Sequence, residues 1–238
     1  LSYHLGQQLL PLRYEQDQQF LDNVQKSFGL IRSIGAELIL GKIFEEIGYH
    51  QVADELFRHL VLSRLLWPGS KLRTVDYLLH YNGIITHEDR IYRYMDKLHK
   101  KQQQQVVDLT VKYTRNVLGG EITVAFFDVT TLYFEASEED DLRRMGFSKD
   151  GKAQNPQILL CLLVGKEGYP LAYEVFEGDC FEGHTLLPVI KSFKMKYHIP
   201  SLVVVADAGL LSKRNIEELK LNNFPFILGA RMKNETEE

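Results

Sequence analysis

The run Ile122-Thr-Val-Ala-Phe-Phe-Asp-Val-Thr-Thr-Leu-Tyr-Phe134 decides the fold of the second half of the chain. Its β-branched and aromatic residues favour a strand, and Asp128 ends the most apolar part of it. Directly before the run, Gly119-Gly120 ends a long helical pattern. The hydrophobic period therefore changes near residue 120. We expect an all-α region at residues 1–119 and a separate domain at residues 120–238.

After this first strand the pattern alternates between strands and helices. The turn at residues 166–168 is too short for a crossover, so the first three strands form an antiparallel meander. Two helical segments then lead to strands that are parallel to the first. The order β-β-β-α-β-α-β predicts an α/β domain with the mixed sheet of the ribonuclease H-like topology. The expected strands are residues 122–134, 156–164, 171–176, 202–206 and 226–228, with helices that begin at Thr185 and Ser212.

The first half shows helical spacing and no strand pattern. Apolar residues recur at intervals of three and four in five segments. Thr86, followed three residues later by Asp89, indicates the start of one of these helices. The expected helices lie within residues 36–47, 52–61, 72–79, 86–98 and 106–117.

The composition is that of a globular protein, with 45% hydrophobic and 25% charged residues among 238. No apolar run approaches the roughly 20 residues of a membrane span, and no signal-peptide pattern begins the chain. The two cysteines have no metal-binding or redox spacing, so we expect a cytoplasmic protein. The net charge of -4 is uneven, because residues 1–120 hold 15 basic and 13 acidic side chains and residues 121–238 hold 13 and 19.

Two aspartates occupy corresponding places in the expected sheet. Asp128 ends the apolar run of the first strand, and Asp207 ends the first strand after the meander. These strands are neighbours in the expected topology, so both carboxylates lie at one edge. Carboxylates that close repel each other unless a hard cation such as Mg2+ or Mn2+ neutralises them. The structural alternative is that each aspartate only caps the transition from strand to loop.

Four segments closely resemble DDE-type transposases of bacterial insertion sequences, in the IS-four-like superfamily with an Asp-Val-Thr-Thr signature. They span residues 125–135, 146–157, 177–187 and 203–212, within a resemblance that runs from about 120 to 233. The resemblance implies an enzyme that cleaves the phosphodiester at a transposon end with metal-activated water and then transfers the strand. It makes Asp128 and Asp207 the catalytic, metal-binding members of an acidic triad, with Mg2+ or Mn2+ as cofactor.

The third triad member of this family is a glutamate on a later helix, and no counterpart occurs in the 238 residues. We therefore expect a C-terminally truncated chain that is inactive by itself. The implied partner is double-stranded DNA, both element ends and target. A homodimer is a further option, since transposases of this kind commonly act as dimers.

Further residues are candidates for DNA contact. Thr130 lies close to the first aspartate, His184 resembles a fixed family position, and basic residues trail along one helix. Ordinary packing or a solvated surface is the alternative for each. The DNA-binding candidates are Thr130, Lys149, Lys152, Asn155, Gln157, His184, Arg90 and Arg93.

Two other functions remain open on the sequence. One is a ribonuclease H-like nuclease that cuts DNA without strand transfer. The other is a non-catalytic DNA-binding remnant, in which the aspartates have lost their role.

Overall fold

A computed structural model describes residues 34–35, 37–136, 138–147, 151–152, 154–210 and 212–229. The described residues form two compact units. One holds those up to residue 46 and residues 50–101, and the other holds residues 47–49 and those from 102 onwards. Each unit is described separately below.

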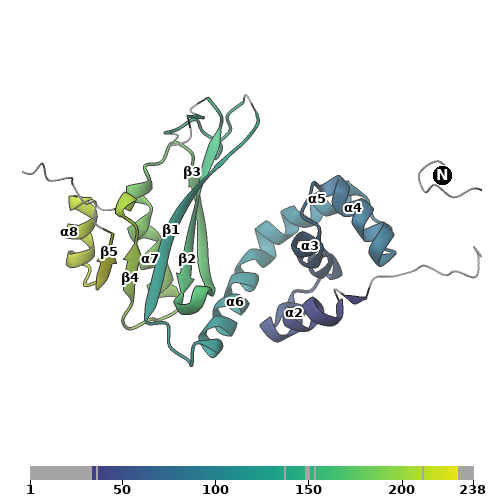
Figure 1. The fold of residues 1–238 in the computed structure, drawn as a ribbon, viewed down its shortest axis with the longest axis horizontal. Coiled ribbons are helices and arrows are strands. Elements are labelled where there is room, and N and C mark those ends of the chain that lie inside the picture. Colours follow the sequence, from purple (N-terminus) through teal and green to yellow (C-terminus); the bar gives the residue numbers. More distant parts are fainter. Residues whose placement is uncertain are drawn as a thin grey trace, which may run out of the picture. The chain divides into compact units, whose positions relative to one another are not determined.

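The first unit is helical, as the periodicity predicts. Its α-helices α2 to α5 are labelled in Figure 1. Short π-type and 3-10 turns separate or extend them. In chain order the elements of this half are η2 (Glu37–Gly41), α2 (Lys42–Ile47), η3 (Tyr49–Gln51), α3 (Glu55–Leu66), α4 (Lys71–Tyr77), η4 (Leu78–Asn82), α5 (Glu88–Lys97) and η5 (Leu98–Gln102).

The start of α5 differs from the prediction. His87 is the N-cap residue, and its Nδ1 accepts the backbone amide of Asp89 at 3.4 Å. The Thr86 hydroxyl is buried, with no hydrogen-bond partner in the described part of the chain. The prediction that Thr86 begins this helix was therefore wrong, because spacing alone does not show which side chain turns back onto the first turn.

The second unit contains a five-stranded sheet in the order β3-β2-β1-β4-β5. The first three strands are antiparallel neighbours, β4 is parallel to β1, and β5 is parallel to β4. This is the expected ribonuclease H-like arrangement, so the predicted fold class is confirmed. The strands are β1 (Val124–Tyr133), β2 (Gln157–Gly165), β3 (Pro170–Glu177), β4 (Val203–Ala206) and β5 (Phe226–Leu228).

Helices join the later strands. The crossovers contain α7 (Leu186–Lys196) and α8 (Lys213–Leu221), and the short turns are η6 (Lys166–Gly168), η7 (Glu182–His184) and η8 (Ala208–Leu210). Ser212 caps α8 as predicted, since its Oγ accepts the amide of Asn215 at 3.0 Å. Thr185 precedes α7, but its hydroxyl donates to the carbonyl of Glu182 at 2.7 Å and makes no cap bond to the helix.

Helix α6 (Gln103–Val117) packs on β3 and belongs to the sheet unit. The Thr114 hydroxyl donates to the carbonyl of Pro170, and the Arg115 guanidinium donates to the carbonyl of Tyr197. The sequence placed this helix in the first region because the hydrophobic period changes only after it. The division into two functional domains, residues 1–119 and residues 120–238, stays a prediction.

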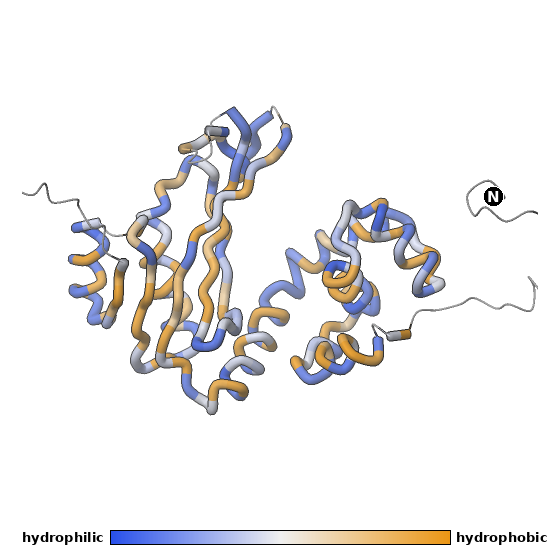
Figure 2. Tube along the Cα trace, viewed as in Figure 1, coloured by the Kyte–Doolittle hydropathy of each residue, from blue (hydrophilic) through white to orange (hydrophobic). Residues whose placement is uncertain are grey.

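The two faces of the sheet differ in how they are covered. One face carries Ala125, Phe127 and Val204, which are buried against α6 and α7 in a single hydrophobic core. On the other face Phe126 is 45% exposed and Ile227 is 63% exposed. Figure 2 shows that the strands are largely hydrophobic, whereas the segment between β1 and β2 is largely hydrophilic. None of the described helices has the length and hydropathy needed to cross a membrane.

Candidate active site

The two predicted aspartates lie at the same level of neighbouring strands. Strands β1 and β4 run parallel, and their last aligned pair is Phe127 with Ala206. Asp128 and Asp207 each follow this pair directly. Neighbouring strands lie about 4.8 Å apart. The sheet therefore brings the two carboxylate-bearing positions together from 79 residues apart in the sequence.

Alternation along the strands places this pair on the less covered face. Asp128 shares the face of Phe126, and Asp207 follows Val205 on that same face. Both aspartates are exposed, whereas Phe127 and Ala206, which directly precede them, are buried in the core. An exposed carboxylate is accessible to a ligand.

Asp207 also organises the turn that follows it. Its Oδ1 accepts the backbone amides of Gly209 at 3.0 Å and Leu210 at 3.3 Å. These bonds fix the carboxylate at the start of η8 and engage one of its two oxygens. Asp207 therefore does cap the transition from strand to loop, which the sequence left open as its structural role. These bonds leave Oδ2 as the oxygen for a ligand.

The donor set fits a hard divalent cation. Two exposed carboxylates at one level of the sheet supply the oxygen ligands that Mg2+ and Mn2+ prefer. A glycine beside them keeps the space open, because a β-carbon at Gly209 would lie 3.1 Å and 3.3 Å from the oxygens of Asp207. Within the described residues, no group of three or more His, Cys, Asp or Glu side chains is arranged to hold a metal.

We predict that Gly209→Ala lowers Mn2+ affinity about tenfold, because the added methyl group crowds both carboxylate oxygens. The backbone at Gly209 does not have the positive φ that disfavours alanine, so folding is preserved. Isothermal titration calorimetry measures the affinity. The control is Gly35→Ala, since a β-carbon there meets no atom within 4 Å. Equal Mn2+ affinity in the two variants would contradict a metal site at Asp207.

Three other candidates lie along β1 and the segment after it. Thr130 is exposed, two residues beyond Asp128 and on the same face. The ammonium of Lys152 lies 5.3 Å from the ring centre of Tyr133, in cation-π contact. The Asn155 amide donates to the carbonyl of Phe134 at 3.1 Å and so fastens the end of the loop to the end of β1. Only Thr130 of the three lies on β1, on the same face as Asp128.

Gln157 has a packing role in place of the expected DNA contact. It is 1% exposed, and its Nε2 donates to the carbonyls of Gly178 at 2.7 Å and Phe147 at 3.2 Å. A side chain buried in this way cannot reach a base edge or a phosphate. Its position at the end of an apolar strand was visible in the sequence, but the direction of the side chain was not. Lys149 lies outside the described residues.

The remaining candidates lie on helical segments. Arg90 and Arg93 are exposed on α5 in the helical unit. His184 ends η7, and its Nε2 lies 3.3 Å from Nη1 of Arg214 on α8. The sequence analysis did not single out Arg214. Thirty residues separate it from His184, and no local pattern links the two positions.

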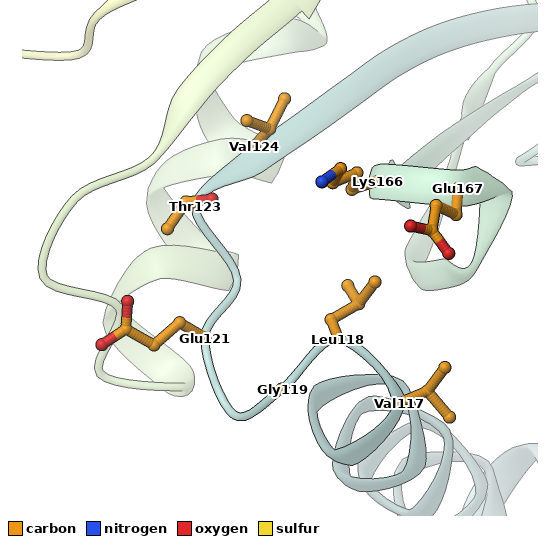
Figure 3. A pocket seen from close by; sticks show the side chains of 8 residues that line it. All are labelled: Val117, Leu118, Gly119, Glu121, Thr123, Val124, Lys166 and Glu167. Carbon is orange, nitrogen blue, oxygen red and sulfur yellow. The ribbon is translucent and has the colours of Figure 1, made fainter.

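A pocket opens at the start of β1, away from the two aspartates. It has a volume of about 450 Å3 and lies where α6 leads into β1 and β2 turns into η6. Figure 3 shows Lys166 and Glu167 on that turn, facing Leu118 at the end of α6. None of the residues predicted from the sequence lines this pocket. This pocket is therefore separate from the candidate active site.

No protein-family model and no curated protein matches this chain. Solved structures do match. The Mos1 transposase paired-end complex with left transposon end is 11% identical, with 73% of this chain and 58% of that chain covered and a TM-score of 0.31. The Mos1 Strand Transfer Complex is 11% identical, with 74% and 58% covered and a TM-score of 0.32. The chain thus spans less than two thirds of the length of these neighbours.

Proposed function

We propose that this chain carries a DNA-binding region and the ribonuclease H-like catalytic core of a DDE-type transposase. The observation that supports it best is the pair Asp128 and Asp207, exposed at one level of adjacent parallel strands in a ribonuclease H-like sheet. The four motif segments favour the IS-four-like superfamily of bacterial insertion sequences. The substrate is double-stranded DNA, and the working form is a homodimer.

Asp128 and Asp207 would hold Mg2+ or Mn2+ through carboxylate oxygens. The bound ion would supply an activated water and stabilise the oxygen that leaves the phosphodiester. The protein's own contribution is positional, because η8 fixes the Asp207 carboxylate through two backbone amides. Thr130 would bind phosphate beside the pair. Lys149, Lys152 and Asn155, from the sequence between β1 and β2, would also contact DNA.

The helical unit would contribute a second DNA contact. Arg90 and Arg93 are exposed on one helix, and their charges suit the DNA backbone. A complete triad needs a third carboxylate, which is not found next to the pair among the residues with a described structure. The chain by itself would therefore bind DNA and one metal ion, but cleave poorly.

We expect Mn2+ to raise the affinity of the chain for a 20-base-pair duplex about tenfold. Two exposed carboxylates repel phosphates, and a bound divalent ion reverses that local charge. Fluorescence anisotropy at constant ionic strength, in Mn2+ and in EDTA, measures the effect. Absence of duplex binding would overturn the proposed function. Equal DNA affinity in Mn2+ and in EDTA would contradict the proposed metal site alone.

One observation favours a second candidate, a non-catalytic DNA-binding remnant. Oδ1 of Asp207 already accepts two amides, which is sufficient reason for an aspartate at that position. In this case the chain binds the duplex equally well in Mn2+ and in EDTA. The same measurement therefore separates the two candidates.

A further inference from the structure

A small pocket lies between the start of α7 and the side of α8. It has a volume of about 180 Å3. Three basic side chains line it, together with one carboxylate and backbone from the first turn of α7. Its polar and charged lining residues are His184, Lys191, Arg214, Asn215 and Glu218.

The charges around this pocket suit an anion. Lys191 forms no ion pair with any residue that the structure describes. The Arg214 guanidinium uses Nε for Glu218 at 3.0 Å and Nη1 for His184 at 3.3 Å. A guanidinium has five N–H donors, so these contacts leave others for a ligand. The pocket therefore has two cationic side chains, Lys191 and Arg214, and one carboxylate, Glu218, which is paired with Arg214.

The start of α7 adds to this field. Leu187 and Pro188 of its first turn are part of the pocket wall. A helix N-terminus carries partial positive charge on amides that are not bonded within the helix. Side-chain capping is absent here because the Thr185 hydroxyl donates to the carbonyl of Glu182. The partial positive charge of this helix end therefore favours an anion in the pocket, although Pro188 itself has no amide hydrogen to donate.

The pocket is connected to the candidate active site through two short turns. Turn η7, which ends at His184, packs against η8, which directly follows Asp207. Helix α8 begins three residues after η8. The chain from Asp207 through η8 to α8 therefore links the aspartate pair to the wall of this pocket.

We propose that this pocket binds a backbone phosphate of DNA, with Lys191 and Arg214 as its principal ligands and His184 as a polar partner. This subsite deepens the proposed function and rests on DNA being the substrate. It orients the strand relative to Asp207 and carries no sequence information, since the contacts are to phosphate. The ligand is a phosphodiester in a polymer, and free phosphate is the alternative source of the same chemistry.

The test compares Lys191→Gln/Arg214→Gln with Lys166→Gln, which removes a cation from the opposite edge of the sheet. Binding of a 20-base-pair duplex is measured by anisotropy in EDTA at several salt concentrations. We expect the double variant to bind about tenfold more weakly, with the slope of log affinity against log salt reduced by about 1, since one phosphate contact is lost. Lys166→Gln should retain the slope of the wild type. The Arg214–Glu218 pair is exposed, so its loss leaves the fold intact.

A double variant with the same affinity and slope as Lys166→Gln overturns the subsite while the proposed function stands. If inorganic phosphate raises the melting temperature of the wild type but not of the double variant, and both bind DNA equally, the pocket takes free phosphate and the proposal is wrong. If the wild type binds no duplex, the proposed function and the subsite fall together. If the double variant loses affinity while Mn2+ has no effect on the wild type, the subsite stands and the metal site falls.

Discussion

Asp128→Asn and Asp207→Asn are each expected to weaken Mn2+ binding about 100-fold, a free-energy change of about 2.7 kcal/mol. Each substitution removes one of the two negative charges at the site, and charge count sets the affinity of such sites. Asparagine keeps the shape of the side chain. At position 207 its amide oxygen still accepts the amides of Gly209 and Leu210, so the turn is preserved.

Calorimetric titration with Mn2+ measures the loss, and the Mn2+ effect on DNA affinity should vanish in parallel. Asp179→Asn is the control, since it removes an exposed carboxylate elsewhere in the same unit. If both active-site variants bind Mn2+ as the control does, the aspartates hold no metal. The remnant would then be the better account of the chain.

Gly178→Ala is expected to lower the free energy of unfolding of the sheet unit by about 3 kcal/mol. A β-carbon at this position would lie closer than 3.0 Å to the backbone carbonyl oxygens of Gln157 and Arg144. Backbone atoms cannot swing aside as a flexible side chain does. The Gly178 carbonyl also accepts the buried amide of Gln157, so a shift would break that bond as well.

The measurement separates the two units. The single tryptophan, Trp67, lies in the helical unit, so its fluorescence reports unfolding there. Circular dichroism in the far ultraviolet reports the sheet as well. We expect the urea midpoint by dichroism to fall, while the fluorescence midpoint stays within experimental error of wild type. Gly35→Ala is the matched control. A sheet that is as stable in Gly178→Ala as in this control would show that the backbone contact is not tight.

Periodicity predicted the elements well where local residues decide them. The β-branched run before Asp128 became β1, and Ser212 caps α8 as its position suggested. Local sequence signals did not identify the helix caps at two positions. Thr86 does not cap α5, because the Nδ1 of His87 accepts the first-turn amide, and Thr185 donates to a preceding carbonyl.

The sequence also did not predict the burial or packing of some residues. Gln157 has the polarity of a surface residue, yet it is buried where the carbonyls of Phe147 and Gly178 meet it. Helix α6 has the periodicity of the helices before it, yet it packs on β3. Both outcomes depend on contacts between segments that are distant in the chain, which no local window contains.

The sequence by itself determined the order of strands and helices, and with it the ribonuclease H-like sheet and the two candidate aspartates. Hydrophobic period and connection length are local properties, so they can be read along the chain. Only the tertiary structure decided that Asp128 and Asp207 share one level and one face, because that depends on the register between β1 and β4. It alone placed Lys191 and Arg214 beside His184, since the packing of α7 against α8 brings those residues to one pocket.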